Sequence, residues 1–365
     1  MVRGYYIHQA GSGLGVRAKI DSQVRSLSVL GRVQSLVLNR SLVDKVRERL
    51  PMMGCDLRAI RDAIVEPDFL YVRKWSIDRQ TLEFFHGVKA AYPRCSILLE
   101  VPTYPYDSEM IARPKDIPLL AKDRRYRQEL SKYVDRVVTF CDQREIFGIP
   151  TIVATNGIDV DSVRVKHQEP KELGRIDLIA VATMIRQHGY DRVLLGMADY
   201  YGSAQRYRVK LHLVGDGPEL RRYRAITRRN GLGDHVVFHG SQSGEALDHL
   251  YDYCDMGLVA FGMHRVGVDR VSALKSREYL ARGIPMVGGC PIDIFEGIDF
   301  PYYLEFPNDD SKVPIPEVVR FYEETAQVAA DTVTTAMRQH AYASCDMPIA
   351  MAPVIEYLGR EVVRR

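Results

Sequence analysis

Residues 272–287 read SALKSREYLARGIPMV and predict a complete helix–turn–strand unit. We expect the helix to begin at about Leu274, with Ser272 as its N-cap. Gly283 suits the left-handed turn that ends a helix, and Pro285 cannot continue the helix. The apolar residues that follow therefore predict a strand, and the whole stretch is typical of an α/β fold.

Lys275 and Glu278 stand three positions apart on this helix and therefore share one face. This face has two interpretations. It is either a solvated ion pair or part of an anion site. In the second case the helix N-terminus and Lys275 bind a diphosphate, while Glu278 accepts hydrogen bonds from a ribose.

Short apolar runs alternate with helix-length amphipathic stretches along the whole chain. Two parallel neighbouring strands need a long crossover, so this alternation predicts parallel sheets. The other predicted strands are Gly4–His8, Val33–Leu38, Phe69–Val72, Ser96–Glu100, Val134–Phe140, Thr151–Ala154, Asp177–Ala182, Val209–Val214, Val236–His239 and Met256–Ala260.

The chain has 365 residues, and at roughly 100–200 residues per domain this length predicts two domains. The polar segment Val163–Gly174 separates two strand–helix series, so we place the boundary there. We therefore expect two Rossmann-like domains, over residues 1–165 and 166–325. Helices over residues 326–365 are expected to return to the first domain.

Composition excludes several classes of protein. Hydrophobic residues make up 46% and charged residues 27% of the chain, as in soluble globular proteins and unlike disordered, collagen-like or disulfide-stapled chains. The formal charge of +3 disfavours a dedicated nucleic-acid binder. The six cysteines form no C-x-x-C pair, which favours reduced thiols over a zinc site. Without a signal peptide or a membrane span, we expect a cytoplasmic protein, with contact at the inner face of the membrane left open.

Two glycine-rich junctions follow predicted strands. Gly11–Gly15 has the spacing G-x-G-x-G, which disfavours the dinucleotide fingerprint and therefore a nicotinamide dehydrogenase. Gly215 and Gly217 stand at the end of another strand, before Pro218 at a helix start. Each junction is either a plain turn or a place where backbone amides approach a phosphate.

Five stretches together resemble one enzyme family. Ala154–Asp159, Val214–Glu219 and Glu278–Pro285 match, in order, landmarks of the GT-B nucleotide-sugar glycosyltransferases, and look like the retaining family 4, or group 1, enzymes. His188–Arg192 and Glu100–Asp107 are similar to a subgroup from bacterial capsule and exopolysaccharide synthesis. The resemblance extends over most of the chain.

The resemblance implies two Rossmann-like domains facing an interdomain cleft, with the acceptor on the first and the donor on the second. The implied reaction moves a hexose-type sugar from a nucleotide diphosphate sugar to a glycan or lipid-linked saccharide, with retention. No cofactor and no metal are implied, because preorganised amides and cations would neutralise the leaving diphosphate.

Site residues carry over onto matching positions. Catalytic candidates are Lys275, Glu278, Arg186, Tyr104 and Asp107. Candidates for binding the donor nucleotide sugar are Gly13, Gly15, Thr183, His188, Arg192, Gly215, Gly217, Ser272, Leu274, Lys275 and Glu278.

The sequence departs from the family at three points. The first acid of the usual E-x7-E pair falls on Arg270, and the usual phosphate-binding cations fall on Thr183 and His188. Lys275, Arg186 or Arg192 is therefore expected to supply the missing charge. The catalytic histidine of the first domain is not evident, and Pro102–Asp107 takes its region.

Other interpretations stay open at this stage. A non-catalytic relative that binds nucleotide sugars or glycans would explain the missing acid, and a nucleotide-sugar epimerase would share the fold. Asp159 and Asp161 form a D-x-D, but after Asn156-Gly157 we read them as loop residues and not as metal ligands. His235 and His239 are interpreted as strand-end residues.

The stretch Arg113–Arg136 combines eight Lys or Arg residues with apolar positions at partly helical spacing. It is either a basic amphipathic helix that contacts an anionic membrane or a helix that packs its apolar stripe on the first domain.

Overall fold

The computed structural model describes residues 1–10, 14–40, 42–50, 53–110, 116–169 and 172–363. Its contacts divide the chain into two compact units. Unit 1 comprises Met1–Gly157 and Met347–Arg365, and unit 2 comprises Ile158–Asp346. The chain therefore passes between units at Gly157, before the expected boundary at residue 165. Of the C-terminal helices, only the last belongs to unit 1.

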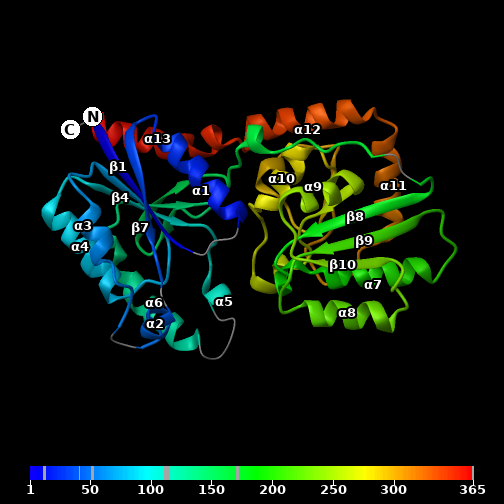
Figure 1. The fold of residues 1–365 in the computed structure, drawn as a ribbon, viewed down its shortest axis with the longest axis horizontal. Coiled ribbons are helices and arrows are strands. Elements are labelled where there is room, and N and C mark those ends of the chain that lie inside the picture. The colour runs from blue at the N-terminus through cyan, green and yellow to red at the C-terminus, as the bar shows by residue number, and fades with distance from the viewer. Residues whose placement is uncertain (11–13, 41, 51–52, 111–115, 170–171, 364–365) are drawn as a thin grey trace. The chain divides into compact units, whose positions relative to one another are not determined.

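The described part of unit 1 contains a seven-stranded sheet in the order β2-β1-β3-β4-β5-β7-β6 (Figure 1). Neighbouring strands are parallel, apart from the antiparallel pair of β6 and β7. The strands are β1 (Val2–Gln9), β2 (Gly31–Leu38), β3 (Phe69–Arg73), β4 (Ser96–Val101), β5 (Arg136–Thr139), β6 (Glu145–Ile146) and β7 (Ile149–Val153).

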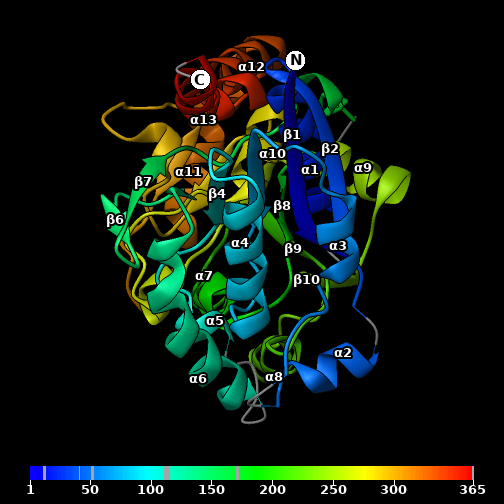
Figure 2. The ribbon, with the colours of Figure 1, turned by 90° about the vertical axis from the view of Figure 1, so that its left-hand side faces the viewer.

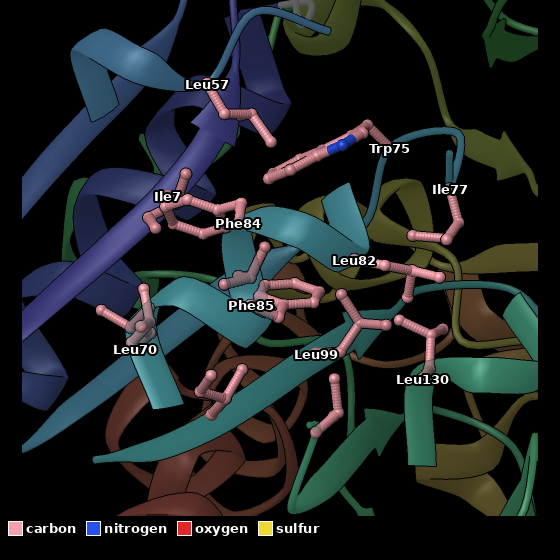
Figure 3. Packing of buried hydrophobic residues seen from close by; sticks show 14 of the residues in the cluster. Ile7, Leu57, Leu70, Trp75, Ile77, Leu82, Phe84, Phe85, Leu99 and Leu130 are labelled. Carbon is pink, nitrogen blue, oxygen red and sulfur yellow. The ribbon is translucent and has the colours of Figure 1, made fainter. Parts of the chain in front are cut away.

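Helices cover both faces of this sheet, which explains the nearly continuous apolar runs of its central strands. Helices α3 and α4 cover one face (Figure 2), and α1 and α13 pack together on the other. Figure 3 shows the first of these cores, where Trp75 and Phe84 lie close to β1. The helices are α1 (Leu14–Leu27), α2 (Leu42–Arg47), α3 (Arg58–Ala63), α4 (Arg79–Ala91), α5 (Asp107–Met110), α6 (Ile117–Tyr126), η2 (Arg127–Lys132) and α13 (Met347–Val363).

In unit 2, the residues described form a sheet of six parallel strands in the order β10-β9-β8-β11-β12-β13. This is the strand order of the Rossmann fold, which reverses between β8 and β11. The strands are β8 (Arg175–Val181), β9 (Arg208–Val214), β10 (Val236–Gly240), β11 (Met256–Leu258), β12 (Met286–Gly288) and β13 (Tyr303–Glu305).

Helices α7, α8 and α11 pack on one face of this sheet, and α9, α10 and α12 on the other (Figure 1). The predicted helix start at Leu274 and its end before Gly283 are confirmed, with Gly283 in the left-handed conformation. The remaining elements are η3 (Val160–Ser162), η4 (Arg186–His188), α7 (Tyr190–Tyr201), α8 (Leu220–Arg229), α9 (Gly244–Tyr253), η5 (Met263–Val266), α10 (Leu274–Arg282), η6 (Asp293–Phe295), α11 (Ile315–Ala326) and α12 (Ala330–Ser344).

Among the helices in the described ranges, none is both long and apolar enough to cross a membrane.

Candidate donor-binding site

The candidate donor residues of unit 2 gather at the carboxyl ends of its parallel strands. Open parallel sheets bind ligands at this edge, where the strand order reverses. Here the loops after β8, β9 and β11 contact one another. Phe261, in the loop after β11, donates its amide to the carbonyl of His188, in the loop after β8, at 2.9 Å. Helix α10 begins beside them, because Lys275 contacts the carbonyl of Val259.

Gly215 and Gly217 allow the loops after β8 and β9 to pack closely. A Cβ at Gly215 would lie 1.9 Å from the carbonyl oxygen of Ala182, and one at Gly217 would lie 2.4 Å from that of Met184. The amide of Met184 in turn donates to the carbonyl of Asp216 at 2.8 Å. Both glycines are therefore required for the shape of this edge, whether or not a phosphate contacts them.

Lys275 provides an uncompensated cation at this edge. Its ammonium donates to the hydroxyl of Tyr190 at 3.0 Å and to the carbonyl of Val259 at 3.1 Å. No described carboxylate forms an ion pair with it, and burial lowers its pKa to about 7. A bound anion would favour the charged form of this group, so Lys275 is suited to bind the diphosphate.

His188 lies beside Lys275 but is not a second cation. Its Nδ1 is 2.7 Å from the carbonyl oxygen of Thr183, and its ring stacks on Tyr190 with centroids 5.7 Å apart. Burial, together with the charge of Lys275, holds its pKa well below the usual range. Because the Thr183 carbonyl only accepts, Nδ1 carries the proton of the neutral imidazole, and Nε2 can accept one hydrogen bond. The Thr183 side chain is exposed.

Arg192 does not lie where a phosphate could reach it. Its side chain is 1% exposed, and its guanidinium donates to the carbonyls of Phe261, Pro307 and Ser311. The expectation that Arg192 supplies phosphate-binding charge is therefore wrong for this conformation. The residue instead joins α7 to two loops. Arg186, in contrast, is exposed in η4.

The prediction that Ser272 is the N-cap of α10 is wrong. The cap position is Ala273, and no side chain caps this end of the helix. The Ser272 hydroxyl donates to Asp293 at 2.7 Å and accepts from Arg277 at 2.9 Å. The buried ion pair of Arg277 and Asp293 thus binds the hydroxyl, which does not cap the amides at the start of α10. Leu274 is half-buried at the start of the helix.

Glu278 and Lys275 do not pair with each other, so the interpretation of this face as a solvated ion pair is wrong. Glu278 instead accepts from Arg282, one turn later, at 3.2 Å. Arg282 also pairs with Asp248 at 2.8 Å and lies over the ring of Tyr251. Lys275 and Glu278 therefore have different surroundings on α10.

Arg270, at the position of the missing first acid, forms an ion pair with Glu296. An acidic side chain is thus present next to this position, but it comes from the segment after η6. Sequence spacing could not reveal it.

The catalytic candidates of unit 1 lie around α5 and η2. The carboxylate of Asp107 accepts from Arg127 at 2.5 Å and pairs with Arg124 at 2.8 Å, and these arginines lower its pKa. Tyr104 packs edge-on against Phe147 and is half-buried. Asp107 is therefore ionised and held by two cations.

Gly15 lies in the first turn of α1, where a Cβ would meet open space. The described contacts of Gly15 therefore do not require a glycine at this position. Gly13 lies outside the described residues.

Unit 1 also holds a charged cluster that sequence analysis missed. The carboxylate of Glu100, in β4, is fully buried and accepts from Arg73 at 2.5 Å, Tyr71 at 2.6 Å and Gln23 at 2.8 Å. Lys19 of α1 pairs with it at 3.3 Å. Burial alone would raise the pKa of Glu100, but the two cations lower it to about 2. The one signal in the sequence was the position of Glu100 within the apolar run of β4, where an acidic side chain must be buried.

Asp159 and Asp161 both accept hydrogen bonds within unit 2. Asp159 accepts the amide of Ser162 at 3.2 Å, and Asp161 accepts the hydroxyl of Tyr342 at 2.5 Å. Within the described ranges, no three His, Cys, Asp or Glu side chains are grouped as metal ligands.

Comparisons with known proteins bear on the whole fold and on unit 2. Solved structures with the same architecture include a glycosyltransferase from Rickettsia africae, with 10% identity, a TM-score of 0.67, and 100% of this chain and 99% of that one covered. The fold is GT-B. HepE of Anabaena, in complex with UDP and glucose, has 14% identity and a TM-score of 0.64 over 99% of this chain and 100% of its own.

Sucrose-phosphate synthase from Thermosynechococcus elongatus has 12% identity and a TM-score of 0.65, over 100% of this GT-B chain and 99% of its own. Residues 162–288 match the model of the glycosyl transferases group 1 family, so unit 2 carries a domain of that kind. No curated protein matches the sequence. These findings support a GT-B glycosyltransferase.

Proposed function

We propose that the protein transfers a hexose-type sugar, with retention, from a nucleotide diphosphate sugar to a glycan or lipid-linked saccharide in bacterial cell-surface polysaccharide synthesis. The observation that carries this proposal is the uncompensated ammonium of Lys275 at the ligand-binding edge of the unit 2 sheet. The group 1 match over residues 162–288 supports the donor class, and the capsule role rests on sequence resemblance.

In the proposed reaction, the bond between the anomeric carbon and the diphosphate breaks and negative charge grows on the leaving oxygen. Lys275 and the uncapped amides at the start of α10 stabilise that charge, because they are already oriented before the reaction. Glu278 accepts hydrogen bonds from the ribose. The acceptor hydroxyl attacks the anomeric carbon from the side of the departing diphosphate, and its proton passes to the leaving phosphate oxygen. Metal independence is part of this proposal.

On the acceptor side, we assign Tyr104 and Asp107 to orienting the acceptor. Asp107 is held by two arginines. Its lowered pKa suits it to accept hydrogen bonds from sugar hydroxyls and makes it a weak proton acceptor.

Calorimetry with uridine, guanosine and adenosine diphosphate sugars tests the donor assignment. Release of nucleoside diphosphate is then followed with a panel of saccharides and lipid-linked saccharides, and NMR of the product gives its anomeric configuration. Lys275→Met should abolish release. Lys312→Met removes an exposed lysine of the same unit that pairs with Asp199, and it should change nothing. Donor binding without any release would favour the non-catalytic relative, and an epimerised sugar would favour the epimerase.

Peripheral contact with an anionic membrane through Arg113–Arg136 also stays a proposal. Tyr126, Leu130 and Tyr133 pack against the core of unit 1, so this part of the apolar stripe is not free to enter a membrane. Lys122 is buried, and Arg124 and Arg127 hold Asp107. The contact would therefore depend on exposed charges such as Arg125. Arg113 and Lys115 lie outside the described residues.

A further inference from the structure

A pocket of about 340 Å³ opens in unit 1 between α2, α3 and the start of α4. Helix α2 follows the carboxyl end of β2, and α4 follows that of β3, so the pocket lies at the ligand-binding edge of the sheet. None of the residues assigned above to donor or acceptor lines it. Its polar lining includes Arg47, Arg58, Arg61, Asp56, Gln80 and Glu83.

The loop that forms one wall is fixed to the start of α4. Asp78, which is 1% exposed, accepts the amide of Cys55 at 2.9 Å and that of Thr81 at 2.8 Å. A Cβ at Gly54 would lie 2.0 Å from the carboxylate of Asp78. Glycine at this position thus lets the loop approach the helix N-terminus.

A buried lysine holds the same loop from the other side. The ammonium of Lys122 donates to the carbonyls of Glu48, Leu50 and Met53, the last at 2.6 Å. Glu48 also pairs with Arg40. Since buried charges are costly unless they are fully bonded, these contacts indicate a wall with a defined shape.

The lining carries one more positive than negative side chain. Three guanidinium groups face two carboxylates, those of Asp56 and Glu83. Arg58 binds both oxygens of Asp56, which lowers the pKa of that carboxyl to about 2, and Glu83 pairs with Arg79 at 2.7 Å. Arg47 and Arg61 therefore supply charge that the two acids do not balance. Among the described residues, the ion-pair partner of Arg61 is the exposed Asp62, at 3.5 Å and outside the lining.

The floor of the pocket is apolar. Phe84 and Leu57 line it and are buried in the core around Trp75 (Figure 3). An apolar floor with hydrogen-bonding walls suits a sugar ring, which has an apolar face and polar edges. The volume lies at the lower end of the range of about 300–1,000 Å³ for small-molecule sites.

We propose that this pocket binds a saccharide unit that carries a phosphate or a carboxylate, as part of the acceptor. The anionic group would lie between Arg47 and Arg61, where a guanidinium can form two parallel hydrogen bonds with it. The identification of the saccharide as the acceptor rests on the proposed function, whereas the binding itself does not.

The test measures binding of glucose, glucose 1-phosphate, glucuronic acid and inorganic phosphate to the full chain by calorimetry or NMR. We expect at least one of the two anionic sugars to bind more than tenfold tighter than glucose and than phosphate. Whichever binds identifies the anionic group. Equal affinity for glucose would overturn the charge assignment, and equal affinity for phosphate would overturn the saccharide assignment.

Arg47→Ala combined with Arg61→Ala should weaken binding of the anionic sugar more than tenfold. Arg32→Ala combined with Arg94→Ala removes the same charge from exposed positions outside the lining and should leave it unchanged. Equal effects of the two double variants would overturn the site. UDP binding, measured in parallel, separates the two proposals, because the pocket variant should leave it intact.

Discussion

If Lys275 binds the diphosphate as proposed, its pKa makes the affinity for a nucleoside diphosphate depend on pH in a calculable way, and UDP serves as the probe. In the free protein this pKa is about 7, because burial disfavours the ammonium and its partners among the described residues are a hydroxyl and a carbonyl, which carry no charge. A bound diphosphate favours the ammonium and raises the pKa, so binding takes up a proton. Affinity must then fall as pH rises above 7, because an increasing share of the free protein lacks that proton.

We assume that the pKa of Lys275 in the complex exceeds about 10. Relative to fully protonated free protein, the unprotonated share of the free protein then lowers the affinity twofold at pH 7 and about 100-fold at pH 9. The expected loss between these values is about 50-fold, or roughly 2.3 kcal/mol. Ionisation of UDP itself has an apparent pKa of about 6, so it is nearly complete over this range. Calorimetry at pH 7 in buffers of different ionisation enthalpy should also detect uptake of about half a proton.

Lys275→Met provides the control, since methionine keeps most of the volume and cannot titrate. Its affinity for UDP should be lower than that of the unaltered protein at pH 7, and it should not change between pH 7 and pH 9. A flat profile in the unaltered protein between pH 7 and 9 would refute the assignment of Lys275 to the diphosphate. A steep profile that persists in Lys275→Met would assign the titration to another group.

Four further predictions concern single features. Glu278→Gln should lower transfer roughly 10- to 100-fold, because a neutral acceptor weakens the ribose hydrogen bonds; circular dichroism checks that the fold is kept, and near-normal turnover would remove Glu278 from the site. Activity should survive EDTA, and loss that manganese or magnesium restores would contradict metal independence. Arg192→Met should cost about 3 kcal/mol or more in the free energy of unfolding, since it leaves buried carbonyls unpaired; a melting temperature unchanged from the unaltered protein would show that the carbonyls find other donors. Arg125→Glu should weaken binding to anionic vesicles by roughly 1–2 kcal/mol without affecting neutral ones, and unchanged sedimentation with the vesicles would count against the membrane proposal.

The sequence was most informative about the strands. All ten predicted segments outside residues 272–287 overlap strands. Central strands such as β4 and β8 are buried on both faces and therefore give continuous apolar runs. The short strands β6 and β13 were missed. Residues of β13 are half-buried or exposed, so their pattern carries little signal.

Site geometry was less predictable because long-range contacts decided it. Helical spacing suggested that Lys275 pairs with Glu278, yet Tyr190 and Val259, distant along the chain, hold the lysine. Ser272 has the chemistry of an N-cap, but Asp293 competes for its hydroxyl. Arg192 was one candidate for the missing phosphate-binding charge, but carbonyls more than sixty positions away hold its guanidinium.

The close packing of Gly215 and Gly217 against Ala182 and Met184 also limits how this enzyme could be re-engineered. Any side chain at either glycine would collide with backbone atoms, which cannot turn aside as a flexible side chain can. A mutant library aimed at a different donor should therefore leave both glycines fixed and randomise Thr183 and Arg186. Those side chains are exposed on the neighbouring loop, so diversity there costs little folding stability.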